Sequence, residues 1–233
     1  STGVRVVNFE DLGEGGMYAD AVINDLYDRS NDLPHYKWGS AYYCIRDEFL
    51  LAQPAAFHEE VKEILVLFGG TDPSNLTQKV FDCIPELMEL GDVHFTFILG
   101  IGYPFYSELA EQVRKHGYNV DLVQNVSRIT EYMGKADIAV SSQGRTMLEL
   151  ASMAVPTILL AQNEREQDHE FGYLKNGFFN LGLGTEVSKK TIVETIRWLM
   201  NCPQLRQQIR TQMLKMDLKN GLKRVLKIIL DEE

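Results

Sequence analysis

Short apolar runs alternate with stretches of helical periodicity along most of the chain. Five such runs lie at residues 64–68, 93–99, 120–123, 138–140 and 157–160. Each is followed by turn residues and then by a stretch in which apolar side chains recur every three or four positions. Unbroken apolar strands that alternate with amphipathic helices are typical of a parallel sheet covered on both faces. Because crossovers between parallel strands are right-handed, the pattern predicts a Rossmann-like α/β layer.

The helical stretches carry their apolar residues on one face. One face comprises Leu76, Val80, Phe81 and Ile84. A second comprises Ile129, Tyr132, Met133 and Ala136. We expect Pro85 to end the first of these helices, because proline cannot continue a helix interior. After Ser188 the pattern is helical only, with Pro203 beginning one helix and Asn220-Gly221 interrupting another.

The N-terminal part has a less regular pattern. Apolar runs at residues 4–8 and 19–24 predict short strands, and a long polar, aromatic loop then leads to residues 42–45. Two or three short strands with long loops bury too little surface to be stable alone. We therefore expect residues 1–55 to be the remnant of an incomplete N-terminal domain, and residues 56–233 to form the Rossmann-like domain with C-terminal helices.

Composition and charge narrow the class of ligand. The net charge of −10 disfavours non-specific binding to nucleic acid or to an anionic membrane surface. It does not exclude a small anionic ligand. Solvent and salt screen distant charges, so the hydrogen-bond donors at the site itself determine whether an anion binds there. Cys44, Cys83 and Cys202 are widely spaced and odd in number, which fits neither a metal site nor a disulfide framework. The chain has no run of about 18 apolar residues and no signal pattern, so we expect a cytoplasmic protein. No metal ligands are evident in the sequence, and we expect neither a metal nor a cofactor.

Two turns at the ends of predicted strands have the residues of a ligand site. The first contains Gly69, Gly70 and Thr71, followed by Asp72-Pro73 as an expected N-cap and first helical residue. The glycines let the backbone turn tightly and approach a ligand. The alternative is that this is only a well-capped turn between a strand and a helix.

The second turn joins the run at residues 138–140 to a helix. Its residues are Ser142, Gln143, Gly144, Arg145 and Thr146, with Glu149 one turn inside the helix. Free backbone N–H groups at a helix start suit a phosphate, and Arg145 can add a charge-assisted hydrogen bond. A carboxylate is a poor neighbour for phosphate, so Glu149 suits a ribose diol instead. The combination favours a nucleoside diphosphate, and the alternative is a glycine turn with Glu149 on a solvated face.

The motifs GG-T-D, S-x-x-G-x-T-x-x-E-x-A-x-x-x-V-P-T-I and Q-N-E-R-E occur in this order along the chain. Together they resemble the C-terminal half of a GT-B fold. More narrowly, they resemble the UDP-sugar hydrolase family of pseudaminic-acid biosynthesis and the related spore-coat polysaccharide proteins. Some of these relatives are fused to an acylneuraminate cytidylyltransferase. The resemblance implies a Rossmann-like parallel sheet, the GT-B C-terminal domain, preceded by the incomplete end of a second Rossmann-like domain.

The resemblance also implies a UDP-sugar in a cleft between the two domains. Glu149 would bind the ribose, and the turn at residues 144–146 would contact the phosphates. Asn125 and Val126 would hold the uracil edge. Residues 69–72 would face the pyrophosphate or the sugar. The sugar would also be reached by Asn163 and Gln167.

Two features depart from the family pattern. Gln143 stands where the family usually has the first of two glycines, and Arg145 stands where it has a small hydroxyl residue. The family's catalytic histidine lies in a G-x-G-H turn, and none of the five histidines here has that context. His169 follows the Q-N-E-R-E stretch and is the histidine expected nearest the cleft. We therefore assign no catalytic residue and expect the chain to lack most of the catalytic N-terminal domain.

Three functions remain open at this point. The leading interpretation is the UDP-sugar-binding part of a deoxyaminosugar hydrolase in nonulosonic-acid or surface polysaccharide biosynthesis. The alternatives are a GT-B glycosyltransferase with a UDP-sugar donor and a non-catalytic binding or partner module. A dinucleotide-dependent oxidoreductase is disfavoured, because no G-x-G-x-x-G follows a strand. Apolar surface left by the incomplete domain leads us to expect a homodimer.

Overall fold

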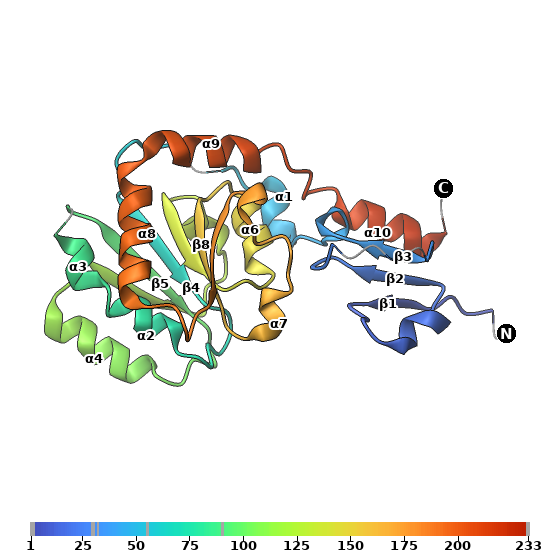
Figure 1. Ribbon diagram of the computed structural model, residues 1–233, viewed down its shortest axis with the longest axis horizontal. Helices are drawn as coiled ribbons and strands as arrows, with labels where there is room; N and C mark the ends of the chain where they lie inside the picture. The colour runs from blue at the N-terminus through green and yellow to red at the C-terminus, as the bar shows by residue number, and fades with distance from the viewer. Residues whose placement is uncertain (1–2, 29–30, 32, 55, 90, 232–233) are drawn as a thin grey trace.

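A computed structural model describes residues 3–28, 31, 33–54, 56–89 and 91–231 of the chain. These residues form two lobes, a large α/β domain and a small lobe that carries both ends of the described chain (Figure 1). The predicted segments 1–55 and 56–233 also include positions outside the described residues, namely Ser1, Thr2, Arg29, Ser30, Asp32, Ala55, Leu90, Glu232 and Glu233.

The large domain is built on a parallel sheet of six strands with the order β6-β5-β4-β7-β8-β9. The strands are β4 (Glu63–Leu67), β5 (His94–Leu99), β6 (Val120–Gln124), β7 (Ile138–Ser141), β8 (Thr157–Ala161) and β9 (Phe178–Leu183). Counted along this domain, the order is third, second, first, fourth, fifth, sixth, which is the order of a Rossmann fold. The predicted fold class is therefore confirmed.

Helices cover both faces of this sheet. One face is covered by α2 (Leu76–Phe81), α3 (Ile84–Met88), α4 (Tyr106–His116) and α8 (Lys189–Asn201). The other is covered by α1 (Asp47–Leu51), α5 (Thr130–Met133), α6 (Thr146–Ser152) and α9 (Pro203–Met213). The short elements α7 (Glu164–Gln167) and η3 (Leu174–Asn176) lie between β8 and β9.

Strand β4 explains why the sequence reads as an unbroken apolar run. Ile64 and Val66 point into the core under α2, α3, α4 and α8. Leu65 and Leu67 point into the core under α1, α5, α6 and α9. Successive side chains of a strand alternate between faces, so a strand with two covered faces has no polar side to present.

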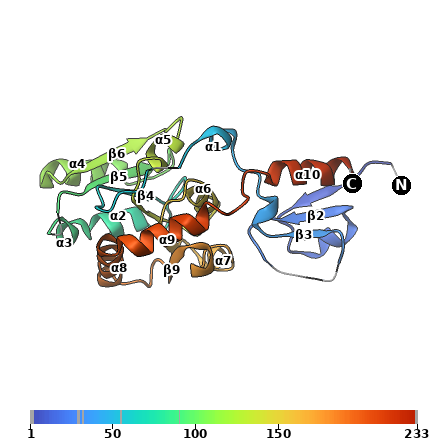
Figure 2. The ribbon, with the colours of Figure 1, turned by 90° about the horizontal axis from the view of Figure 1, so that it is seen from above.

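The small lobe is a parallel three-stranded sheet with the order β1-β2-β3. Its elements are β1 (Val7–Phe9), η1 (Glu14–Tyr18), β2 (Ala21–Asn24), β3 (Tyr36–Trp38) and η2 (Ser40–Tyr42). The last helix, α10 (Gly221–Leu230), returns from the large domain and packs on this sheet against β2 and η2 (Figure 2). Gly221 is needed there, because a Cβ at this position would overlap the Tyr43 carbonyl oxygen. The domain boundary after residue 55 stays a prediction, with α10 as the part of the second segment that joins the small lobe.

The chain thus crosses between the lobes twice. The first crossing runs through residues 43–46, and the second runs through residues 214–220. Lys219 ties the second crossing to the end of α1, because its Nζ donates to the carbonyl oxygens of Leu50, at 3.3 Å, and Ala52, at 3.1 Å. Within the described residues, no helix is long and apolar enough to cross a bilayer.

Several predicted elements are wrong in detail. Helix α2 ends at Phe81, and Pro85 lies in the first turn of α3, where its missing N–H has no cost. Helix α2 begins at Leu76 and not at Pro73. The strands predicted at residues 4–8 and 19–24 are shorter and begin later, at Val7 and Ala21. Two strands were not predicted: β3 has only three residues, and Asn180 and Gly182 interrupt the apolar pattern of β9.

Candidate functional site

The loops at the carboxyl ends of β4 and β7 separate to opposite faces of the sheet. β4 is followed by α2 on one face, and its neighbour β7 is followed by α6 on the other. Such a switch point opens a crevice at the sheet edge, where ligands of open α/β folds bind. The two turns singled out from the sequence lie at this point, after residues Leu67 and Ser141.

A cavity of about 270 Å³ lies at this edge. It is lined by Arg46, Leu67, Gly69, Gly70, Ile98, Leu99, Gly100, Ile101, Asn125, Val126, Ile129 and Thr146. Five of these are residues that the sequence proposed for a nucleotide site: Gly69, Gly70, Asn125, Val126 and Thr146. The structure therefore brings together the glycine turn after β4, the loop after β6 and the start of α6 around one space; the uracil contact of Asn125 and Val126 stays a prediction.

Glycines allow two loops that line this cavity to come into close contact. A Cβ at Gly100 would overlap the backbone of Gly70, so the loops after β4 and β5 approach to within backbone contact. The N–H of Gly102 donates to the carbonyl oxygen of Gly70 at 3.1 Å and fixes that approach. Gly69 has a φ of +80° and Asn125 a φ of +57°, a region that favours glycine. Left-handed non-glycine residues cluster at ligand sites, where the surrounding structure holds them.

Arg46 is the functional candidate that the sequence did not single out. Among the residues that line the cavity, it alone carries a charge. Its Nε donates to Glu149 Oε1 at 2.7 Å, its Nη1 lies 3.0 Å from Glu48 Oε1, and its side chain is 53% exposed. The sequence feature that could have drawn attention to Arg46 is its position directly before α1, in the C-I-R-D-E-F stretch. A half-exposed guanidinium beside apolar walls suits an anionic ligand.

Glu149 is held by this arginine in the first turn of α6. The residue is only 6% exposed. Burial raises the pKa of its carboxyl, and the hydrogen bond and charge of Arg46 oppose that shift. Its role as the ribose acceptor stays a prediction.

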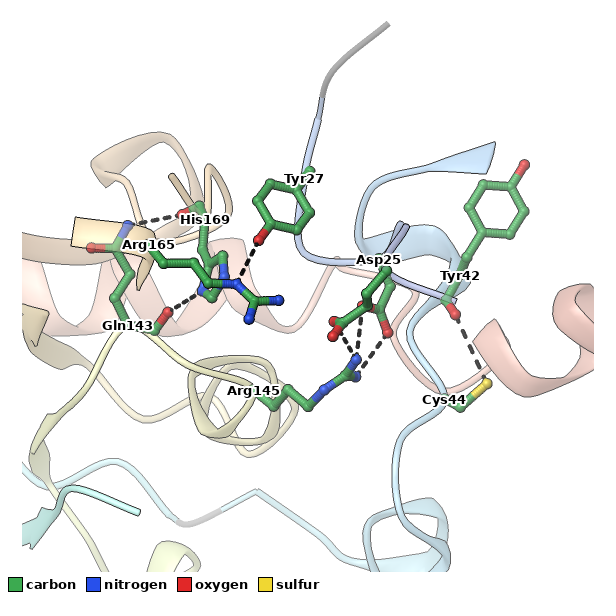
Figure 3. Close-up of polar contacts among 9 residues, drawn as sticks. Asp25, Tyr27, Tyr42, Cys44, Gln143, Arg145, Arg165 and His169 are labelled. Carbon is green, nitrogen blue, oxygen red and sulfur yellow. Dashed lines mark hydrogen bonds and ion pairs between the residues drawn. The ribbon is translucent and has the colours of Figure 1, made fainter. Parts of the chain in front are cut away.

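Arg145 reaches the small lobe. Its Nη1 lies 3.0 Å from Asp25 Oδ2, and its Nη2 bonds Asp25 Oδ1, at 3.3 Å, and Glu10. Figure 3 shows the guanidinium directed at Asp25 and away from Gln143. Burial raises the pKa of Asp25, and the Arg145 charge opposes the shift. A phosphate contact by Arg145 stays a prediction, and it would require the guanidinium to leave these carboxylates.

Gln143 is wholly buried and its amide is used inside the large domain. Its Nε2 donates to the His169 carbonyl oxygen at 2.9 Å, and its Oε1 accepts from Asn180 Nδ2 at 2.8 Å. Its backbone N–H donates to Glu166 Oε2 at 3.2 Å. The side chain in place of the family's glycine therefore joins the turn to β9 and to the loop after α7. The neighbouring Ser142 is buried and Gly144 is half-buried.

Asp72 points at the start of α2. Its carboxylate accepts from the N–H groups of Leu76, at 3.0 Å, and Thr77, at 2.7 Å, and from Gln162 Nε2 at 2.6 Å. It caps the helix from four residues before its first residue, which corrects the predicted N-cap geometry. Thr71 beside it is exposed. The assignment of both residues to the nucleotide stays a prediction.

The predicted sugar-side residues lie outside the cavity lining. Asn163 is the N-cap of α7, where its Oδ1 accepts from the Glu166 N–H at 3.1 Å. Gln167 is half-buried at the end of α7. His169 is buried, with Nδ1 donating to the Gln143 carbonyl oxygen at 2.7 Å and its ring 5.2 Å edge-on from Tyr27. The described residues contain no cluster of three or more His, Cys, Asp or Glu side chains arranged for a metal ion.

Sequence comparisons place this fold and site in context. Residues 64–225, more than half of the chain, match the glycosyltransferase family 28 C-terminal domain. The spore coat polysaccharide biosynthesis protein SpsG of Bacillus subtilis is 25% identical over 215 residues, covering 88% of this chain and 63% of SpsG. Protein MJ1062 of Methanocaldococcus jannaschii is 27% identical over 220 residues, covering 81% of this chain and 45% of that protein. The chain thus spans about half to two thirds of the length of these curated relatives.

Solved structures share the fold at low sequence identity. Acinetobacter baumannii MurG superposes with a TM-score of 0.69 at 13% identity, covering 98% of this chain and 68% of MurG. Anabaena HepE, solved in complex with UDP and glucose, superposes with a TM-score of 0.58 at 13% identity, covering 97% of this chain and 70% of HepE. The parallel sheets and their order are those of the GT-B fold. The chain belongs to the glycosyltransferase family 28 C-terminal domain family.

Proposed function

We propose that this chain is the nucleotide-sugar-binding part of a GT-B glycosyltransferase-like enzyme that takes a UDP-sugar donor in surface polysaccharide biosynthesis. One observation carries the proposal. The cavity at the switch point combines one cation, Arg46, with glycine backbone at Gly69 and Gly70 and with apolar walls. A UDP-sugar matches this combination, because its base has flat apolar faces and its diphosphate is anionic.

The lining divides into two parts that fit the two parts of the ligand. Apolar side chains on β5 and in the loop after β6, such as Ile98 and Val126, suit a nucleobase. The diphosphate would lie near Arg46, Gly70 and Thr146, within reach of backbone N–H groups. The volume is near the lower limit of about 300 Å³ for small-molecule sites, so the sugar would extend towards the gap between the lobes.

The chemistry follows from the leaving group. Transfer breaks the bond between the anomeric carbon and the diphosphate oxygen, and the electron pair leaves with UDP. The acceptor hydroxyl forms the new bond and loses its proton. A fixed guanidinium beside the diphosphate stabilises the charge that develops as this bond breaks, which is often the largest contribution to such catalysis. We assign no catalytic base to the described residues.

The relatives support this proposal over hydrolysis. SpsG is named for spore coat polysaccharide biosynthesis. A relative from Caldanaerobacter subterraneus, 25% identical over 181 residues, is named as a transferase of N-acetylglucosamine from UDP-N-acetylglucosamine. The hydrolase that the motifs resemble would use the same nucleotide site with water as the acceptor. A nonulosonic-acid pathway remains part of that second proposal.

Two experiments test the proposal. Calorimetric titration with UDP should show binding, and its absence at millimolar UDP would favour a non-catalytic partner module. Incubation of the full-length protein with UDP-sugars should then release UDP only when an acceptor is present. Release of free sugar without any acceptor would replace the transferase by the hydrolase.

A further inference from the structure

Two arginines connect the lobes in opposite directions. Arg145, directly before α6, reaches Asp25 and Glu10 of the small lobe. Arg46, in the segment that leaves the small lobe, reaches Glu149 on α6. Because Arg145 and Glu149 are one helical turn apart, the two contacts lie on the same end of α6. We call the set formed by Arg145, Asp25, Glu10, Arg46 and Glu149 the interlobe brace.

The carboxylates of the brace are more deeply buried than the arginines. The side chains of Asp25 and Glu149 are 7% and 8% exposed, whereas that of Arg145 is 47% exposed. Removing a guanidinium from such a pair leaves a buried carboxylate without its partner, which is strongly unfavourable. These pairs therefore favour a fixed position of the small lobe and of residues 43–46 against α6.

Arg145 also contacts the first crossing between the lobes. Its guanidinium lies over the ring of Tyr43, 5.8 Å from the ring centre. Tyr43 is three residues before Arg46, the charged residue of the cavity. On the other side, Arg145 is followed directly by Thr146, which also lines the cavity. Arg145 itself lies outside the cavity lining. It is connected to two lining residues, to Thr146 as the next residue and to Arg46 through Tyr43.

We propose that Arg145 is a positioning residue: through Asp25, Glu10 and Tyr43 it holds the small lobe so that Arg46 faces the cavity. The effect on a nucleotide rests on the proposed function above; the effect on the lobes does not. Arg145 then acts on the ligand only through the brace. Asp25, which lies on the small lobe and outside the cavity lining, must therefore also matter for the ligand.

The test compares Arg145→Ala, Asp25→Asn and the double variant by calorimetric titration with UDP. Arg145→Ala should weaken UDP binding about 10-fold, and Asp25→Asn should weaken it less, because the contacts of Arg145 with Glu10 and Tyr43 remain. The double variant should be no weaker than Arg145→Ala, because residues in contact are non-additive. Hydrogen exchange is measured in parallel on residues 40–46, where both single variants should exchange faster than the unchanged protein. Lys190→Ala, which removes an exposed pair with Glu194 in α8, is the control and should change neither quantity.

The outcomes separate the alternatives. If Arg145→Ala weakens UDP binding and Asp25→Asn leaves it unchanged or tightens it, Arg145 contacts the phosphate and the positioning role is overturned. Unchanged hydrogen exchange at residues 40–46 in Arg145→Ala also overturns it. If the unchanged protein binds no UDP, the proposed function fails, and the exchange measurement alone decides whether the brace exists.

Discussion

Replacing Arg46 by methionine should separate the charged part of the ligand from the base. Methionine keeps the unbranched apolar stem and removes the guanidinium, whose carbon lies 5.3 Å from the centre of the Phe49 ring. If Arg46 binds the diphosphate, the variant loses a charge-assisted hydrogen bond worth about 1.5–3 kcal/mol. The dissociation constant for UDP should then rise by a factor of about 10–150. Since the side chain is 53% exposed, we expect the lower half of this range.

Uridine provides the internal comparison for this variant. It keeps the base and the ribose and lacks the diphosphate, so its affinity should change little in Arg46→Met. Calorimetric titration with UDP and uridine measures both. An equal loss for the two ligands would mean that the substitution deformed the cavity, and an unchanged affinity for UDP would remove Arg46 from the site.

The same substitution has a second effect, on Glu149. Burial already raises the pKa of this carboxyl, and Arg46 opposes the shift, so the variant should raise the folded-state pKa further. A group whose pKa is raised by folding contributes stability below its unfolded pKa, and that contribution is lost as pH rises through the folded pKa. The loss of unfolding free energy in Arg46→Met should therefore be small in acid and grow towards neutral pH. Urea unfolding at several pH values measures it, and a loss that is equal at all pH values would contradict this account.

Three further predictions concern other parts of the molecule. Gly100→Ala should destabilise the protein by about 1–3 kcal/mol, because its Cβ would overlap the Gly70 backbone, and a thermal unfolding midpoint equal to that of the unchanged protein would refute the close approach. Burial raises the pKa of Glu166, whose Oε2 accepts from two backbone N–H groups. Its contribution to stability is therefore lost as the pH rises through the folded-state pKa. In urea unfolding at several pH values, Glu166→Gln should flatten the fall in unfolding free energy above the unfolded pKa of about 4.5. A stripe of exposed apolar side chains along α10, including Leu226 at 46% and Leu230 at 61%, supports the expected homodimer, and elution as a monomer in gel filtration at high concentration would count against it.

The regular part of the fold could be predicted because its signals are local. Each central strand, such as β4, is buried on both faces and reads as an apolar run. Strand β9 lies at the edge of the sheet and carries Asn180, whose amide bonds Gln143 across the sheet. A polar residue inside a strand is explained only by a partner that is distant in the sequence, so the pattern there gave no strand.

The sequence analysis identified several loops that line the cavity and missed the long-range charges beside it. Gly69, Gly70 and Thr146 line the cavity, and they could be singled out because turns and helix starts have sequence signatures; their contact with a nucleotide stays a prediction. Arg46 and Arg145 pair with carboxylates more than 100 residues away, which spacing along the chain cannot indicate. For the same reason, Asp72 was read as an ordinary N-cap, when its partners include Gln162 from the loop after β8.

The return of α10 has a consequence for dissecting this protein. Arg5 near one end of the chain and Asp231 near the other are joined by an ion pair of 2.9 Å, so both ends of the described chain belong to the same lobe. A stop codon after residue 220 would uncover β2, although β2 lies some 200 residues upstream. A separately expressed small lobe would have to carry residues 221–231 through a short linker, whereas the large domain could be cut out as one continuous piece.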